Sequence, residues 1–196
     1  VDACVTDPPY GIGYTHGGGG LGIHGSRRRN ANMPIHGDDR PFDPAPFLGY
    51  PHVLMFGADH YKARLPNGGT WICWDKHTGI GPDDKFSDAE FAWANFRVAR
   101  NVIRFLWKGV ACVKAGEDNG ARYHPTTKPV GLMLKCISLV PDPADFILDP
   151  FMGSGTTGVA CANLGRKFIG IEIDERYFDI SCERIDAAYR QQRLFA

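Results

Sequence analysis

The stretch "LDPFMGSGTTGVACANLG", residues 148–165, predicts a β-strand, a tight glycine-rich loop and an α-helix in direct succession. The apolar residues before it complete the strand, and Gly165 is expected to end the helix, because glycine is the usual residue just after a helix C-terminus. Gly153 and Gly155 lack a Cβ, so backbone N–H groups and the start of the helix can approach a nucleotide-like ligand closely.

The following apolar segment, "KFIGIEID", predicts a strand that carries an acidic residue near its end. Glu172 stands nineteen residues after Gly153, where a carboxylate can accept both hydroxyls of a ribose. No Gly-Lys-Ser/Thr follows the glycines, which disfavours a P-loop, and the third glycine of a dinucleotide-binding loop is missing from its usual place. A nucleoside cofactor without a long phosphate chain fits better, and a plain strand-to-helix connection is the alternative for this pair of features alone.

The rest of the chain alternates in the same way, which predicts an α/β fold with a mostly parallel sheet. Strands are expected at 1–6, 52–57, 70–76, 98–109, 145–151 and 167–174, and helices at 59–65, 87–96, 126–140, 156–164 and 175–190. The helix at 87–96 is predicted from a Ser-x-x-Glu capping box that runs from Ser87 to Glu90. We find no internal repeat and expect a single domain over residues 1–196.

Composition excludes several classes of protein. The 22 basic and 22 acidic residues cancel, so a nucleic-acid partner would have to be met by a local patch. Six scattered cysteines without a CxxC pair indicate reduced thiols in a cytosol-like compartment. No apolar run approaches the roughly 20 residues of a membrane span, and no leader opens the chain. Because residue 1 lies inside an expected strand and is not methionine, we expect the natural protein to start earlier.

A second distinctive stretch, "VTDPPYGIGYTHGGGG", occupies residues 5–20. The expected strand must end at Asp7, because Pro8 and Pro9 cannot donate hydrogen bonds to a strand ladder. Residues 11–40 are rich in glycine, contain "SRRRN" and lack periodicity, which predicts a long mobile loop of the kind that is often functional. On its own, Asp-Pro-Pro-Tyr could also be an ordinary turn after a strand.

Together, three motifs resemble those of the amino-methyltransferases that act on DNA. Residues 7–10 match the catalytic Asp/Asn/Ser-Pro-Pro-Tyr/Phe tetrad, and "FMGSG" at 151–155 matches the Phe-x-Gly-x-Gly cofactor loop. "HPTTKP" at 124–129 is similar to the family's His-Pro-Thr-Gln-Lys-Pro element, with Thr127 in place of glutamine. The order, tetrad first and cofactor loop last, is that of the family's β group, and "DKFSDAEFAWANF" is similar to methyltransferases of phages and prophages.

The resemblance implies S-adenosylmethionine as cofactor and gives each motif a role. Asp7 and the Pro8 carbonyl would accept hydrogen bonds from the target amine, Pro9 would help to fix the backbone, and Tyr10 would stack on a flipped base. No metal is required. The candidate cofactor-binding residues are Thr126, Lys128, Asp149, Phe151, Gly153, Gly155, Thr156 and Glu172, and the candidate phosphate contacts are Arg27, Arg28 and Arg29.

The resemblance also implies a substrate. Aspartate in the tetrad is typical of the family's N6-adenine enzymes and serine of its N4-cytosine enzymes, so N6 of adenine in double-stranded DNA is favoured and N4 of cytosine is the alternative. A non-catalytic nucleic-acid or nucleoside-binding relative also stays open, because only residues 108–123 are available for target recognition. The resemblance implies a restriction-modification or phage setting in the cytosol of a bacterium or a phage-infected host. The oligomeric state is open, with a homodimer among the options.

Finally, the resemblance implies a Rossmann-like methyltransferase fold with one antiparallel strand and strand order 3-2-1-4-5-7-6. Family strand 1 would be 146–149, strand 2 would be 168–171 and strand 4 would be 3–6, with strand 3 expected before residue 1. We therefore predict a six-stranded sheet with strand 2 at an open edge. Residues 1–123 would form the catalytic half and residues 124–196 the cofactor half.

Overall fold

The computed structural model describes residues 1–13, 35–76, 87–107 and 127–193. Within these residues seven strands form one sheet in the order β5-β3-β4-β2-β1-β6-β7. The strands are β1 (Ala3–Thr6), β2 (His52–Phe56), β3 (Thr70–Asp75), β4 (Ala89–Ala94), β5 (Val102–Arg104), β6 (Phe146–Asp149) and β7 (Lys167–Gly170). The helices are η1 (Ala45–Phe47), η2 (Lys62–Arg64), α2 (Val130–Leu139), α3 (Thr156–Asn163) and α4 (Glu175–Arg193), the first two being 3₁₀ turns.

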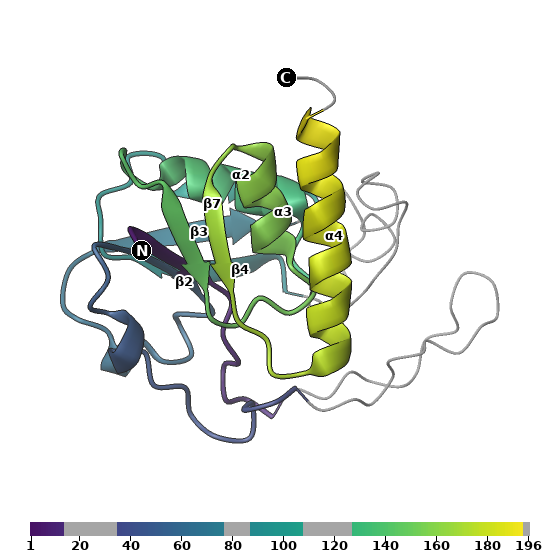
Figure 1. The fold of residues 1–196 in the computed structure, drawn as a ribbon. Coiled ribbons are helices and arrows are strands. Elements are labelled where there is room, and N and C mark those ends of the chain that lie inside the picture. The colour runs from purple at the N-terminus through teal and green to yellow at the C-terminus, as the bar shows by residue number, and fades with distance from the viewer. Residues whose placement is uncertain (14–34, 77–86, 108–126, 194–196) are drawn as a thin grey trace.

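The three α-helices lie on one face of the sheet, and a loop segment that includes η1 covers part of the other face. α2 packs on α3 and α3 packs on α4, and Figure 1 shows the three side by side. Consecutive side chains of β2 point to opposite faces: Leu54 and Phe56 join the core beneath the helices, whereas Val53 and Met55 join a smaller apolar cluster with Phe42. The central strands are thus buried on both faces, as expected for parallel strands in an α/β fold.

The centre of the sheet brings the two decisive stretches together. β1 pairs in parallel with β6, with Ala3 opposite Ile147 and Cys4 opposite Leu148. Asp7 and the glycine loop therefore both follow carboxyl ends of neighbouring strands, where α/β folds usually bind ligands. This confirms the predicted adjacency of family strands 1 and 4, and β7, family strand 2, is the last strand at its end of the described sheet, as predicted.

The predicted helix at 87–96 is wrong, because this segment forms β4. β4 pairs antiparallel with both β2 and β3, and these two sets of backbone hydrogen bonds outweigh the local helix-start signal. The Ser87 hydroxyl donates instead to the carbonyl of Ala89 (2.6 Å). The sheet consequently has seven described strands rather than six, with β4 as the antiparallel strand and β5 parallel to β3 at the other edge.

Other element boundaries differ in smaller ways. The segment 59–65 contains only the 3₁₀ turn η2, and α2 begins at Val130 with Pro129 as the N-cap residue. Of the predicted mobile loop at 11–40, residues 14–34 lie outside the described residues, whereas its two ends are held together: Asp38 accepts hydrogen bonds at Oδ1 from the backbone N–H groups of Gly11 (2.7 Å) and Ile12 (3.3 Å). Of the helices placed by the structure, none has the length and apolarity needed to cross a bilayer.

Candidate active site

The carboxylate of Asp7, directly after β1, is fixed by one donor on each oxygen. The Tyr10 hydroxyl donates to Oδ1 (2.6 Å), and the Lys128 ammonium donates to Oδ2 (2.7 Å). Lys128 Nζ also lies 3.2 Å from the Tyr10 hydroxyl oxygen. The Asp7 side chain keeps 21% of its surface exposed, so a ligand can still reach it. Pro8 is buried beneath this corner, which holds the backbone in place.

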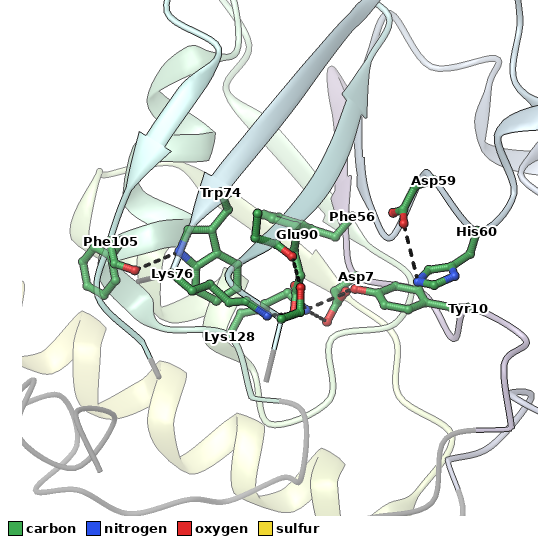
Figure 2. A network of polar contacts seen from close by, with 12 residues as sticks. Asp7, Tyr10, Phe56, Asp59, His60, Trp74, Lys76, Glu90, Phe105 and Lys128 are labelled. Carbon is green, nitrogen blue, oxygen red and sulfur yellow. Dashed lines mark hydrogen bonds and ion pairs between the residues drawn. The ribbon is translucent and has the colours of Figure 1, made fainter. Parts of the chain in front are cut away.

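The ring of Tyr10 lies in a slot lined by the segment after β2. It stacks on His60 with ring centroids 5.1 Å apart and an interplanar angle of 19°. Gly57, with φ of +65°, lies so close that a Cβ at this position would collide with the ring. The glycine is therefore required both for its left-handed backbone and for its lack of a side chain. Figure 2 shows Tyr10 between His60 and the Asp7 carboxylate.

A chain of alternating charges extends from Asp7 into the sheet. Lys128, just before α2, lies 3.2 Å from Oε2 of Glu90 on β4, and Oε1 of Glu90 accepts a hydrogen bond from Lys76 (3.1 Å) at the end of β3 (Figure 2). We call Asp7, Lys128, Glu90 and Lys76 the charge network. The sequence pattern suggested only a helix-capping role for Glu90 and no role for Lys76, because these positions come close to Asp7 only through the pairing of β4 with β2 and β3.

Burial and pairing shift the pKa values in this network in different directions. Burial raises the pKa of Asp7, and Lys128 only partly opposes that rise. Burial would also raise the pKa of Glu90, but Lys128 and Lys76 outweigh it and hold the pKa below its ordinary value. For Lys128, the two carboxylates outweigh burial and raise the pKa of the ammonium. The ion pairs of the network therefore oppose the effect of burial on both carboxylates and on Lys128.

The glycine loop after β6 presents one open glycine and one packed glycine. Gly153 has φ of +53°, and a Cβ built there meets no described atom within 4 Å. Its N–H donates to Oε2 of Glu172 (2.9 Å), whose Oε1 accepts from the backbone N–H of Asp174 (2.8 Å). Gly155 has φ of +79°, and a Cβ there would lie 2.7 Å from Cβ of Ser181 on α4. The loop is thus open at Gly153 and closely packed at Gly155.

Asp149 joins three elements beneath this loop. It accepts hydrogen bonds from the hydroxyls of Thr6 (2.7 Å) and Thr157 (2.6 Å) and from the N–H of Phe151 (3.0 Å). Only 2% of Asp149 is exposed, and burial raises its pKa to about 6. These contacts tie β1, β6 and α3 together at the ligand edge of the sheet.

The remaining predicted residues fall into three groups. Phe151 packs edge-on against Phe42 and Phe47, with centroids 5.7 and 5.6 Å apart, and Thr156 is buried at the start of α3. Lys128, predicted for the cofactor pocket, contacts the tetrad and Glu90. Arg27, Arg28, Arg29 and Thr126 lie outside the described residues. The roles assigned to all of these residues stay predictions.

The mostly parallel sheet, with its antiparallel β4 and a glycine loop after β6, is the Rossmann-like fold of S-adenosylmethionine-dependent methyltransferases. The solved complex of M1.HpyAVI with SAM matches with a TM-score of 0.55 and 27% identity, covering 95% of this chain and 89% of that one. The cytosine-N4-specific PvuII DNA methyltransferase has the same fold, with a TM-score of 0.55 at 16% identity, covering 97% and 85% of the two chains.

Sequence comparisons point to the same class of protein. A family model described as DNA methylase, covering N6 and N4 enzymes, matches residues 102–183. Type II methyltransferase M2.DpnII of Streptococcus pneumoniae is 43% identical over 85 residues, which are 43% of this chain and 31% of that protein. Type II methyltransferase M.HinfI of Haemophilus influenzae is 38% identical over 130 residues, 62% of this chain and 36% of that protein. The chain thus matches about a third of the length of each, and it resembles DNA amino-methyltransferases in both sequence and fold.

Proposed function

We propose that this chain transfers a methyl group from S-adenosylmethionine to an exocyclic amino group in double-stranded DNA, and that the group is N6 of adenine. The observation that carries the proposal is the placement of the Asp7 carboxylate and the open Gly153 loop after adjacent parallel strands. Similarity to two Type II methyltransferases supports it. So does the likeness to M1.HpyAVI, whose structure contains SAM.

The residues around the loop fit this cofactor. Open space at the Cβ position of Gly153 lets a ligand approach the backbone. Glu172 is half-buried beside it, and within the described part of the chain each of its oxygens accepts one hydrogen bond, which leaves acceptor capacity for ribose hydroxyls. When bound, the cofactor supplies a methyl group already activated by the positive charge of its sulfonium.

Asp7 and Pro8 address the difficult part of the reaction, the weak nucleophilicity of an amine conjugated to an aromatic ring. Two hydrogen bonds from the amine, to Asp7 and to the Pro8 carbonyl, would draw the nitrogen lone pair out of conjugation and aim it. Tyr10 offers an aromatic surface for the base, and its own hydroxyl is fixed on Asp7. Positioning and electrostatics therefore account for most of the proposed catalysis.

The choice between adenine and cytosine is made by the first tetrad residue. Aspartate at position 7 favours adenine, by the resemblance described above. The likeness to the cytosine-N4-specific PvuII enzyme concerns the fold alone, so N4 of cytosine remains the alternative substrate.

Two measurements test the proposal and separate it from a non-catalytic binding relative. Calorimetric titration should show that the wild type binds S-adenosylmethionine and that the affinity of Asp7→Ala lies within a few-fold of the wild-type value. Tritiated methyl transfer to unmethylated DNA should occur with the wild type and be abolished in Asp7→Ala, because Asp7 meets the amine rather than the cofactor. Binding without transfer by the wild type would favour the non-catalytic relative, and transfer by Asp7→Ala at the wild-type rate would refute the mechanism.

A further inference from the structure

The charge network contains two groups, Lys128 and Glu90, that have no role in the proposed steps of cofactor binding and amine positioning. Lys128 is 9% exposed and lies between two carboxylates, with 2.7 Å to Asp7 and 3.2 Å to Glu90. Glu90 comes from β4 and is held on its other side by Lys76 (3.1 Å). None of these distances involves the glycine loop. The network therefore acts on Asp7, the proposed hydrogen-bond acceptor for the target amine, rather than on the glycine loop.

We propose that Lys128 and Glu90 are a positioning pair for methyl transfer, in which Glu90 anchors Lys128 and Lys128 holds Asp7 ionised and correctly oriented. The inference rests on the proposed function and deepens it. Neither residue needs to touch the transferred methyl group, since both act through Asp7.

Two hydrogen-bond donors fix the orientation of the Asp7 carboxylate. A carboxylate that accepts only one hydrogen bond can rotate, whereas Asp7 has a donor on each oxygen, Tyr10 on Oδ1 and Lys128 on Oδ2. Each carboxylate oxygen can accept more than one hydrogen bond, so a fixed Asp7 still has a site for the amine. A flexible lysine gives such control only when its own position is fixed, and Glu90 supplies that second contact.

The charges of the network also suit the proposed reaction. Methyl transfer places positive charge on the target nitrogen, so an unbalanced lysine beside Asp7 would oppose it. Glu90 and Asp7 carry two negative charges against the two positive charges of Lys128 and Lys76. Lys128 therefore favours the ionised form of Asp7, and the network leaves no excess cation at the reacting centre.

The titration of Asp7 gives a readout that a purely structural role would not change. The groups that act on its carboxylate are Lys128, Glu90 and Tyr10, with Asp149 and Tyr61 also close enough to interact electrostatically. Lys128 lowers the pKa of Asp7 and Glu90 raises it. Removing either charge should therefore move the acid limb of the pH–rate profile, and in opposite directions.

The experiment compares the single-turnover rate of methyl transfer across pH, at saturating DNA and S-adenosylmethionine, for the wild type, Lys128→Met and Glu90→Gln. Lys128→Met should slow transfer about 100-fold and shift the acid limb to higher pH. Glu90→Gln, which keeps the side-chain volume, should slow it about tenfold and shift the acid limb to lower pH. Affinity for the cofactor should stay within threefold. Glu183→Gln, the same charge change at an exposed position of α4, is the matched control and should change nothing.

Each outcome has a distinct meaning. Opposite shifts with retained cofactor affinity support the pair. If the wild type is active and the pH profiles of the variants are unchanged, the inference alone is overturned. A loss of cofactor affinity in Lys128→Met also overturns it, because Lys128 would then be a cofactor-binding residue. A wild type that transfers no methyl group overturns the proposed function and this inference with it. If Lys128→Met fails to fold, Glu90→Gln decides by the direction of its shift.

Discussion

Alanine substitutions at Gly153 and Gly155 of the glycine loop should differ in their main effect: the first should weaken cofactor binding more, and the second should destabilise the fold more. Both glycines have left-handed backbones, so alanine at either position should cost roughly 1–2 kcal/mol of folding free energy in strain. At Gly155 the new Cβ would also lie 2.7 Å from Cβ and 2.9 Å from Cα of Ser181. Overpacking of this kind adds about 1–3 kcal/mol, because α4 cannot move away without losing its packing on α3.

At Gly153 the added methyl group meets no described protein atom and instead projects into the space proposed for the cofactor. Gly153→Ala should therefore destabilise the fold by only the strain, roughly 1–2 kcal/mol, but weaken S-adenosylmethionine at least about tenfold, or ~1.4 kcal/mol. Gly155→Ala should destabilise the fold by roughly 2–5 kcal/mol. Its cofactor affinity, measured where the variant is folded, should fall less than that of Gly153→Ala.

Urea unfolding followed by circular dichroism gives the folding free energies, and calorimetric titration gives the affinities. The two glycines serve as each other's control, because both variants make the same chemical change two residues apart. Wild-type affinity in Gly153→Ala would show that the cofactor does not approach this backbone. Equal destabilisation of the two variants would show that the contact of Gly155 with α4 is not the close packing seen here.

Two further predictions concern buried and half-buried carboxylates. Glu172→Ala should weaken S-adenosylmethionine by one to two orders of magnitude, roughly 1–3 kcal/mol for lost hydrogen bonds to a charged group, whereas Glu183→Ala on the exposed side of α4 should leave calorimetric affinity unchanged. Asp149 has its pKa raised from 3.8 to about 6 by burial, so its contribution to stability is complete below pH 3.8 and is lost as pH rises through about 6. The shift in pKa corresponds to about 3 kcal/mol of folding free energy, at ~1.4 kcal/mol per pH unit. Asp149→Asn should remove this pH dependence, because an amide does not titrate in this range and can still form hydrogen bonds with Thr6, Thr157 and the Phe151 N–H. Urea unfolding at pH 4 to 7 should show wild type losing stability relative to the variant; a constant difference would contradict the assignment.

The parts of the fold that the sequence predicted correctly depend on local chemistry. Asp-Pro-Pro ends β1 because proline cannot donate to a ladder, and the glycines after β6 mark a turn that few other residues could form. The pairing of β1 with β6 was predicted from the resemblance to a known strand order, and the structure confirms it.

The parts that were missed depend on contacts distant in the sequence. The Ser87 to Glu90 spacing is typical of a helix start, but strands on both sides convert the segment into β4. The same pairing carries Glu90 to Lys128, 38 positions along the chain, so the helix error also concealed the charge network. Asp38 was missed for a similar reason, since only folding shows that it binds the backbone after the tetrad.

The most direct test of the central proposal is to identify the methylated nucleoside. Unmethylated double-stranded DNA is incubated with the protein and S-adenosylmethionine carrying a deuterated methyl group, digested to nucleosides and analysed by mass spectrometry. We expect deuterated N6-methyladenine with the wild type and none with Asp7→Ala. N4-methylcytosine in its place would correct the substrate while keeping the amine chemistry at Asp7. Label only on a ring carbon, or no label in DNA despite bound cofactor, would contradict the proposal that Asp7 and Pro8 direct an exocyclic amine to the methyl group.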